Sequence, residues 1–231
     1  MAKFYGIGVG PGDPELMTVK GARILKESPV VMIPEAKKNG GSIAFEIARE
    51  YIGEKTETVF FEFPMVHDRG KIMEAAAGMA RRVEEYIGQG KDVAFITLGD
   101  SSLYSTYGYV LECLDEKIEV ETIPGITSYS TVAATANRQL AVGNEILSII
   151  PATADPKRIE MAMEAAGGIV IMKASHEPER ITRLLKEGGY LEHSVLARKV
   201  SMEAGELRKD VEAALKDGKD YLTTIIGRRS E

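Results

Sequence analysis

The chain has few of the residues that build disulfide frameworks or metal sites. Among its 231 residues there is one cysteine, Cys113, and there are three histidines, His67, His176 and His193. A single cysteine excludes a disulfide framework, and histidines spaced this widely do not form a typical zinc-binding pattern. We therefore expect neither disulfide bonds nor a bound metal ion.

Long hydrophobic runs and an excess of basic residues are also missing. No apolar stretch approaches the roughly 20 residues that cross a bilayer, and the start MAKFYGIG lacks the apolar core of a signal peptide. The formal net charge is −6, whereas nucleic-acid-binding domains usually carry a basic face. We therefore expect a cytoplasmic protein that binds neither membranes nor nucleic acid.

Short β-rich runs alternate with helical patterns along the whole chain. Strands are expected at 4–9, 30–33, 58–61, 92–97, 118–123, 146–150, 168–172, 194–200 and 221–227. Helices are expected at 19–26, 42–52, 70–87, 104–114, 127–136, 156–165 and 177–187. Strands separated by helices of this length are typical of βαβ crossovers and parallel sheets. A strand meets Pro-Gly near residues 122–124, so we predict two α/β domains, 1–122 and 123–231.

A glycine-rich loop, GIGVGPGDPE, follows the first strand. It fails the dinucleotide-binding fingerprint in every register, because Pro11, Asp13 or Glu15 occupies the third glycine position, and it lacks the Gly-Lys-Ser/Thr of a phosphate loop. Two interpretations stay open. The segment is a tight strand-to-helix turn with Asp13 or Thr18 as the helix cap, or it shapes a ligand site.

The segment TLGDSSLYST, residues 97–106, places Asp100 directly after an apolar strand. Ligands of open α/β sheets bind outside the carboxyl ends of the strands, so Asp100 is a candidate ligand-binding residue. The alternative is that Asp100 only caps the following helix. A serine hydrolase is disfavoured, because Gly-x-Ser-x-Gly is absent and no orienting acid accompanies His176.

Four segments occur in a definite order: GIGVGPGDPELMTVKGARIL, TLGDSSLYSTYGYV, ETIPGITSYSTVAA and YLTTIIGRR. Together they resemble the tetrapyrrole methylase family, the S-adenosylmethionine-dependent enzymes of cobalamin and sirohaem biosynthesis. Tyr104-Ser105-Thr106 is similar to the members that methylate C20 of precorrin-2 or cobalt-factor II. Ser101 departs from the family pattern, in which a proline is usual, and this departure leaves a less rigid turn.

The resemblance implies two α/β domains, a mainly parallel sheet in the first and a mixed sheet in the second, with the cofactor in the cleft between them. It also implies a homodimer. Carried over by position, the residues implied to contact the cofactor are Val9, Asp100, Leu103, Thr127, Ser128, Met172, Thr223 and Thr224. The first loop, with Gly10, Pro11, Gly12 and Asp13, is implied to border the tetrapyrrole trough.

The implied reaction moves a methyl group from the sulfonium of S-adenosylmethionine to the C20 carbon of the macrocycle and leaves S-adenosylhomocysteine. Alignment of the reacting atoms is then the main task of the protein. Asp100 and Tyr104 are the candidates for removing the C20 proton. The substrate is a polycarboxylate, so basic residues are expected at its edge: Arg69, Lys71, Lys173 and Arg198.

Several alternatives stay open at this point. A sister methylase could act at another ring carbon, as the uroporphyrinogen-III or precorrin-4 (C11) enzymes do. A non-catalytic ligand-binding protein could also be built on the same fold. Between the metallated and the metal-free substrate, we favour cobalt-factor II.

Overall fold

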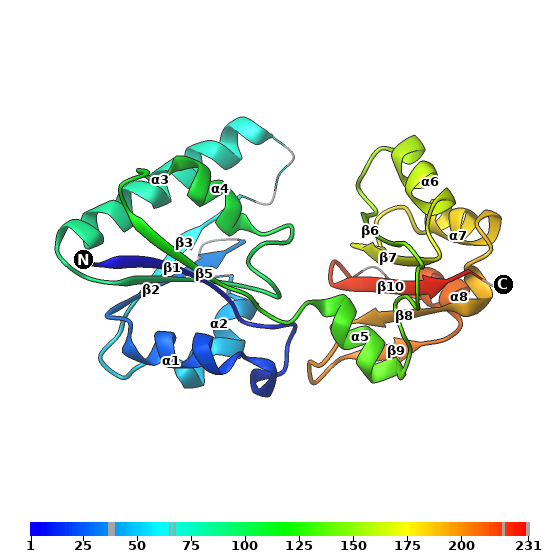
Figure 1. Cartoon of the computed structure of the whole chain (residues 1–231), viewed down its shortest axis with the longest axis horizontal. Coiled ribbons are helices and arrows are strands. Elements are labelled where there is room, and N and C mark those ends of the chain that lie inside the picture. Colours follow the sequence, from blue (N-terminus) through cyan, green and yellow to red (C-terminus); the bar gives the residue numbers. More distant parts are fainter. Residues whose placement is uncertain (37–39, 65, 67, 219, 230–231) are drawn as a thin grey trace. The chain divides into compact units, whose positions relative to one another are not determined.

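The structure, a computed structural model, describes residues 1–36, 40–64, 66, 68–218 and 220–229. These residues contain two five-stranded sheets. One sheet lies in the unit Met1–Thr127 and the other in the unit Ser128–Glu231 (Figure 1). His67, one of the three histidines of the chain, lies outside the described residues.

The sheet of the first unit is parallel throughout. Its strands are β1 (Lys3–Gly8), β2 (Val30–Glu35), β3 (Glu57–Glu62), β4 (Val93–Thr97) and β5 (Glu119–Ile123), in the order β3-β2-β4-β1-β5. Strands buried on both faces read as continuous apolar runs, and all five residues of β4 are buried. The parallel sheet predicted from the alternating pattern is confirmed.

Helices cover both faces of this sheet. The helices are α1 (Val19–Glu27), α2 (Ile43–Ala48), α3 (Arg69–Gly88) and α4 (Thr106–Cys113), with 3₁₀ turns η1 (Pro14–Leu16) and η2 (Arg49–Tyr51). Helices α1 and α2 lie on one face of the sheet and α3 and α4 on the other (Figure 1). Leu25 of α1 and Ile47 of α2 accordingly belong to one core cluster, whereas Val83 of α3 and Val110 of α4 belong to another.

This arrangement places a topological switch point between β1 and β4. The two strands are neighbours, but the chain leaves β1 for the face of α1 and leaves β4 for the face of α4. Open α/β sheets bind their ligands at such a point, outside the carboxyl ends of the strands.

The second unit has a mixed sheet, as the resemblance implied. Its elements are α5 (Ser128–Ala136), β6 (Leu147–Pro151), α6 (Pro156–Glu164), β7 (Gly168–Met172), α7 (Pro178–Glu187), η3 (Leu191–His193), β8 (Ser194–Arg198), β9 (Glu206–Arg208), α8 (Val211–Lys216) and β10 (Thr223–Arg228). The order is β6-β7-β10-β8-β9, with β6 parallel to β7 and the other pairs antiparallel. The short elements β9 and α8 were not predicted.

The two faces of the second sheet are covered unequally. Helices α6, α7 and α8 contribute Ile159, Leu185 and Leu215 to the larger cluster on one face. Helix α5 alone contributes Val132 and Ala133 to the smaller cluster on the other face. Successive residues of β10 therefore alternate between an α6–α8 face and an α5 face.

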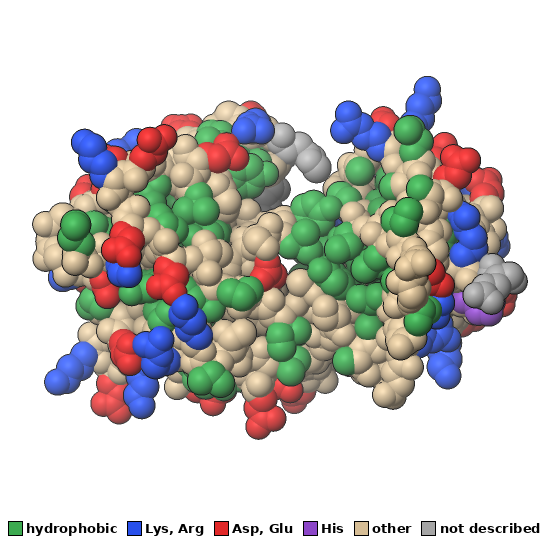
Figure 2. All heavy atoms as spheres, viewed as in Figure 1, with side chains coloured by type: hydrophobic (Ala, Val, Ile, Leu, Met, Phe, Trp, Pro, Cys, Tyr) green, Lys and Arg blue, Asp and Glu red, His purple; other side chains and the backbone are tan. Residues whose placement is uncertain are grey.

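The surface carries both signs of charge. Figure 2 shows acidic and basic side chains interspersed on the visible face of each unit, in keeping with the modest net charge of −6. Within the described part of the chain, no helix is both long enough and apolar enough to pass through a bilayer.

Candidate functional site

Three loops meet at the carboxyl ends of β1, β4 and β5 in the first unit, and we call residues 8–13, 98–105 and 123–126 the three-loop cluster. Gly10 and Gly99 form an antiparallel bridge, in which Gly10 N donates to Gly99 O at 3.1 Å and Gly99 N to Gly10 O at 2.8 Å. The first two loops are thus joined by their main chains at the switch point of the sheet.

Asp100 joins the second loop to the third. Its Oδ2 accepts a hydrogen bond from Gly125 N at 2.8 Å, and its Oδ1 accepts from Ser102 N at 2.9 Å and from the Ser102 hydroxyl. The N-terminus of α4 is capped instead by Ser105, whose Oγ accepts from Tyr107 N at 3.0 Å. The alternative that Asp100 caps this helix is therefore wrong.

These hydrogen bonds set the charge state of Asp100. Burial by itself would raise the pKa of the carboxyl, but the donors on Ser102 and Gly125 together hold the pKa below its usual value. Asp100 is consequently a carboxylate at neutral pH and a weak base. A carboxylate has about four acceptor sites, so one stays open to a ligand after these three bonds.

Ser101 stands where the resemblance to the tetrapyrrole methylases leads us to expect a proline, and it holds the turn by a hydrogen bond instead. Its side chain is only 2% exposed, and its Oγ donates to Ile123 O at 2.8 Å. The hydroxyl therefore ties the Gly-Asp turn to the end of β5, which offsets the loss of rigidity expected from the sequence. A serine committed to a main-chain carbonyl in this way is poorly suited to act as a nucleophile.

The other first-unit candidates lie around these bonds. Val9 is fully buried, and its N donates to Thr97 O at 3.0 Å. Tyr104 is half exposed and has a φ of 50°, in the left-handed region where backbone strain often marks a functional turn. Gly10 and Pro11 are buried, whereas Leu103, Gly12 and Asp13 are half-buried.

Both capping residues considered for the first loop act as caps. Asp13 accepts from Glu15 N at 2.9 Å and starts the 3₁₀ turn η1, whereas Thr18 accepts from Gly21 N at 3.2 Å and starts α1. The loop between Gly8 and Thr18 is thus held by its own side chains and by the Gly10–Gly99 bridge.

In the second unit, three of the expected cofactor residues gather on the α5 face, and we call Ser128, Met172 and Thr224 the β7–β10 cluster. Thr224 is paired with Met172 across the sheet, and its Oγ1 lies 3.4 Å from Ser128 Oγ at the start of α5. Thr127, the last residue of the first unit, precedes Ser128 directly.

Thr223 points to the other face. Its Oγ1 donates to Asp220 O at 2.5 Å, next to the core cluster under α6, α7 and α8. Sequence alone left Thr223 and Thr224 equivalent, whereas the alternation of β10 puts only the Thr224 hydroxyl beside Ser128 and Met172.

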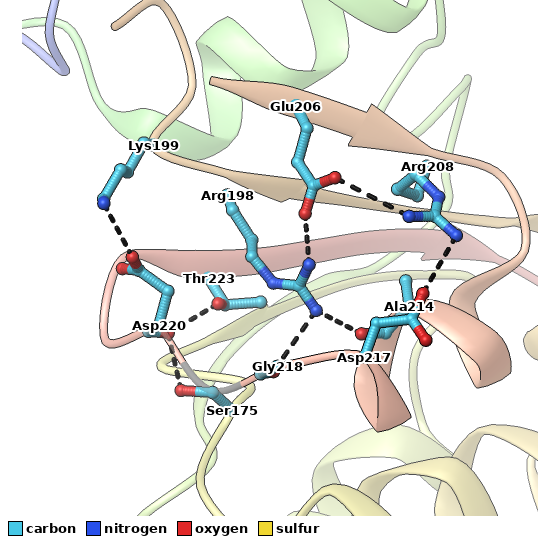
Figure 3. A network of polar contacts seen from close by, with 10 residues as sticks. All are labelled: Ser175, Arg198, Lys199, Glu206, Arg208, Ala214, Asp217, Gly218, Asp220 and Thr223. Atoms are coloured by element: carbon cyan, nitrogen blue, oxygen red, sulfur yellow. Dashed lines mark hydrogen bonds and ion pairs between the residues drawn. The ribbon is translucent and has the colours of Figure 1, made fainter. Parts of the chain in front are cut away.

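Arg198 also lies on the α6–α8 face, away from the β7–β10 cluster. Its guanidinium forms an ion pair with Glu206 and donates to Ala214 O and, at 3.3 Å, to Gly218 O (Figure 3). Its side chain is only 13% exposed. The expectation that Arg198 binds substrate stays a prediction, and these partners point to a role inside the protein.

The remaining basic candidates are at the surface. Arg69 of α3 pairs with Glu112 of α4 at 3.1 Å, and Lys173 lies after β7 with its Nζ 5.4 Å from the centre of the Tyr221 ring. Lys71 is exposed on the first turn of α3. Among the residues that the structure describes, no group of three or more His, Cys, Asp or Glu side chains could hold a metal ion.

Sequence reasoning missed a polar group next to the β7–β10 cluster. Asp220 accepts hydrogen bonds from Ser175, Leu222 and Thr223 and pairs with Lys199 (Figure 3). Ser175 and Lys199 come from segments far from Asp220 in the sequence, and no spacing pattern could have signalled their meeting with it.

Comparisons with a family model and with individual proteins point to the same family. The family described as Tetrapyrrole (Corrin/Porphyrin) Methylases matches residues 3–215. A cobalt-precorrin-2 C(20)-methyltransferase of Salmonella typhimurium is 34% identical, over 97% of this chain and 95% of the relative. A probable cobalt-precorrin-2 C(20)-methyltransferase of Methanocaldococcus jannaschii is 33% identical, over 98% of this chain and 96% of the relative.

A solved structure shows the same fold. The uroporphyrin-III C-methyl transferase of Thermus thermophilus, complexed with S-adenyl homocysteine, superposes with a TM-score of 0.67 at 20% identity. The superposition covers 98% of this chain and 92% of the other.

Proposed function

The chain belongs to the tetrapyrrole (corrin/porphyrin) methylase family, and on this premise we propose that it transfers a methyl group from S-adenosylmethionine to C20 of a precorrin-2-type tetrapyrrole in cobalamin biosynthesis. The observation that carries the proposal is the sequence identity of 34% and 33%, over nearly the full length of the chain, with two proteins named for this C20 reaction. Both names specify the cobalt-containing substrate, which supports cobalt-factor II or cobalt-precorrin-2 over the metal-free precorrin-2.

The chemistry of the two clusters fits the cofactor. The three-loop cluster offers the charged Asp100 at a switch point, with one acceptor site open for a hydroxyl or amine of the ligand. The β7–β10 cluster offers the hydroxyls of Ser128 and Thr224 beside the apolar Met172. S-adenosylmethionine has a polar ribose, a polar amino-acid part and an apolar adenine face. A site for it therefore needs hydrogen-bond donors, acceptors and apolar surface of this kind.

When bound, S-adenosylmethionine supplies an electrophilic methyl group and is released as S-adenosylhomocysteine. The residues of this chain then act mainly by position. Val9, Asp100, Leu103, Thr127, Ser128, Met172 and Thr224 are the residues that we propose for holding the cofactor, whereas the hydroxyl of Thr223 faces away from the β7–β10 cluster. Such alignment can be worth effective molarities of about 10⁵ M or more.

Removal of the C20 proton needs an acceptor, for which Asp100 and Tyr104 are the candidates. The lowered pKa of Asp100 makes its carboxylate better suited to binding than to accepting a proton. Tyr104 lies half exposed beside the Gly-Asp turn, but the phenol of a tyrosine carries its own proton at neutral pH and would have to lose that proton to water before it could take one from C20. Asp100 and Tyr104 therefore both stay candidates.

The tetrapyrrole itself is proposed to lie against the first loop, at Gly10, Pro11, Gly12 and Asp13, with its carboxylates near Arg69, Lys71 or Lys173. Residues 1–122 would form the substrate trough, and residues 123–231 would complete the cofactor site. A cytoplasmic homodimer belongs to the same proposal, and sedimentation equilibrium of the purified protein tests the dimer.

The activity is tested with methyl-labelled S-adenosylmethionine and three separate acceptors: the cobalt form of precorrin-2, metal-free precorrin-2 and uroporphyrinogen III. We expect label in the cobalt form and none in uroporphyrinogen III. Label in uroporphyrinogen III would favour a sister methylase. Binding of S-adenosylhomocysteine without transfer to any acceptor would favour a non-catalytic protein.

A further inference from the structure

The start of β10 is held by a polar network around Asp220. The main-chain oxygen of Asp220 accepts from Ser175 Oγ at 2.6 Å and from Thr223 Oγ1 at 2.5 Å, while Oδ1 accepts from Leu222 N at 2.8 Å. Oδ2 lies 3.0 Å from Lys199 Nζ. One residue thereby joins the segments after β7, after β8 and before β10, as Figure 3 shows.

Main-chain bonds make the same connections. Ala174 N donates to Thr223 O at 3.0 Å, and Lys199 N donates to Leu222 O at 3.0 Å. Leu222 and Thr223 are therefore held by the segments that directly follow the two neighbouring strands, β7 and β8.

Arg198 anchors the network from the side of α8. Its guanidinium pairs with the carboxylate of Glu206 in β9 and donates hydrogen bonds to the carbonyls of Ala214 in α8 and of Gly218 after it. A cation at the carboxyl end of a helix is favourable, because the last carbonyls lack partners and carry partial negative charge. The end of α8 and the chain that leads into β10 are thus tied to the end of β8.

Backbone strain occurs directly after the ends of β7 and β8, in the segments that contact Asp220. Lys173, which follows Met172, has a φ of 57°, and Lys199, which follows Arg198, has a φ of 45°. Ser201 has a φ of 60°. Left-handed conformations of residues other than glycine persist only where the surroundings enforce them, and they concentrate at ligand sites and switch regions.

We propose that Asp220 and Arg198 are positioning residues, which fix the start of β10 and so hold Thr224 and Met172 in place for the cofactor. This inference rests on the function proposed above. Neither residue needs to touch the cofactor, since both lie on the α6–α8 side of β10 and act through Leu222 and Thr223. The charged groups that act on the Asp220 carboxylate are the cations of Lys199 and Arg198.

The central test is Asp220→Ala, with two measurements on the full-length protein. Amide hydrogen exchange of Leu222, Thr223 and Thr224 is measured without ligand, and the dissociation constant for S-adenosylhomocysteine is measured by titration calorimetry. Loss of hydrogen bonds to a charged group is expected to speed this exchange roughly tenfold or more and to weaken ligand binding by a similar factor.

Three further variants separate positioning from general loss of structure. Asp220→Asn keeps an acceptor for Leu222 N and is expected to restore most of the affinity. Lys199→Gln removes only the exposed ion pair, and we expect roughly a threefold loss of affinity. Asp217→Ala removes an equal charge from the same network, but Asp217 contacts Arg208 and not β10, so affinity and exchange should stay within about twofold of wild type.

The inference is overturned if Asp220→Ala binds S-adenosylhomocysteine as tightly as wild type, or if Asp217→Ala weakens binding as much as Asp220→Ala. If the wild-type protein itself does not bind S-adenosylhomocysteine, the proposed function fails and this inference fails with it. Tight binding by wild type together with unchanged binding by Asp220→Ala would refute this inference alone.

Discussion

Replacement of Gly125 by alanine should disrupt the three-loop cluster. A Cβ at Gly125 would lie 2.1 Å from Gly99 O, 2.7 Å from Gly8 C and 2.8 Å from Gly8 Cα. All three atoms belong to the main chain, so no side chain can rotate away to make room. The third loop must move, and with it the Gly125 N–H that donates to Asp100 Oδ2.

Two costs follow from this displacement. Forcing an extra methyl group into a closely packed site costs about 1–3 kcal/mol. Loss of a hydrogen bond to a charged group costs about 1.5–3 kcal/mol more. We therefore expect Gly125→Ala to lower the free energy of unfolding by about 3–5 kcal/mol, which corresponds to a fall of roughly 10–20 °C in the melting temperature.

The assay is thermal unfolding followed by circular dichroism, with Gly108→Ala as the matched control. Gly108 lies within α4 of the same unit, and a Cβ there meets no atom within 4 Å. Alanine is the better helix former, so Gly108→Ala should be stabilising by about 0.5–1 kcal/mol. A Gly125→Ala protein as stable as wild type, or a Gly108→Ala protein destabilised to the same extent, would refute the packing argument.

Three other predictions concern single side chains. Because the folded-state pKa of Asp100 is lowered, the stability that its carboxylate contributes is complete above about pH 4 and disappears as the pH falls through the folded-state pKa. In urea unfolding, Asp100→Asn should therefore be less stable than wild type at pH 7, and the difference in unfolding free energy should narrow at pH 2–3. Ser101→Ala should lose about 1–2 kcal/mol in the same assay, because Ile123 O is left without its donor. Thr224→Val should weaken S-adenosylhomocysteine binding roughly three- to tenfold and by more than Thr223→Val; equal effects would mean that the strand face is assigned wrongly.

The sequence was sufficient for the architecture because its signals are local. Alternation of buried runs with amphipathic segments predicts β1–β5 and their crossovers, and the boundaries agree within a few residues. Strand β9 and helix α8 were missed because both are short and lie in a charged segment, where hydrophobic periodicity is weak.

The candidate site was only partly predictable because its contacts are non-local. The position of Asp100 at a strand end could be predicted, but its bond to Gly125 joins residues 25 apart in sequence. The choice between Thr223 and Thr224 needs the face of β10 that α5 covers, which no local pattern supplies. The partners of Arg198 and Asp220 likewise appear only when β8, β9 and β10 are assembled.

The most direct test of the proposed function uses S-adenosylmethionine with a ¹³C-labelled methyl group and the cobalt form of precorrin-2. The product is isolated, and the labelled carbon is located by nuclear magnetic resonance. The account predicts one labelled methyl group on C20. A labelled methyl group on any other ring carbon, or no transfer from a protein that is folded and binds S-adenosylhomocysteine, would contradict it.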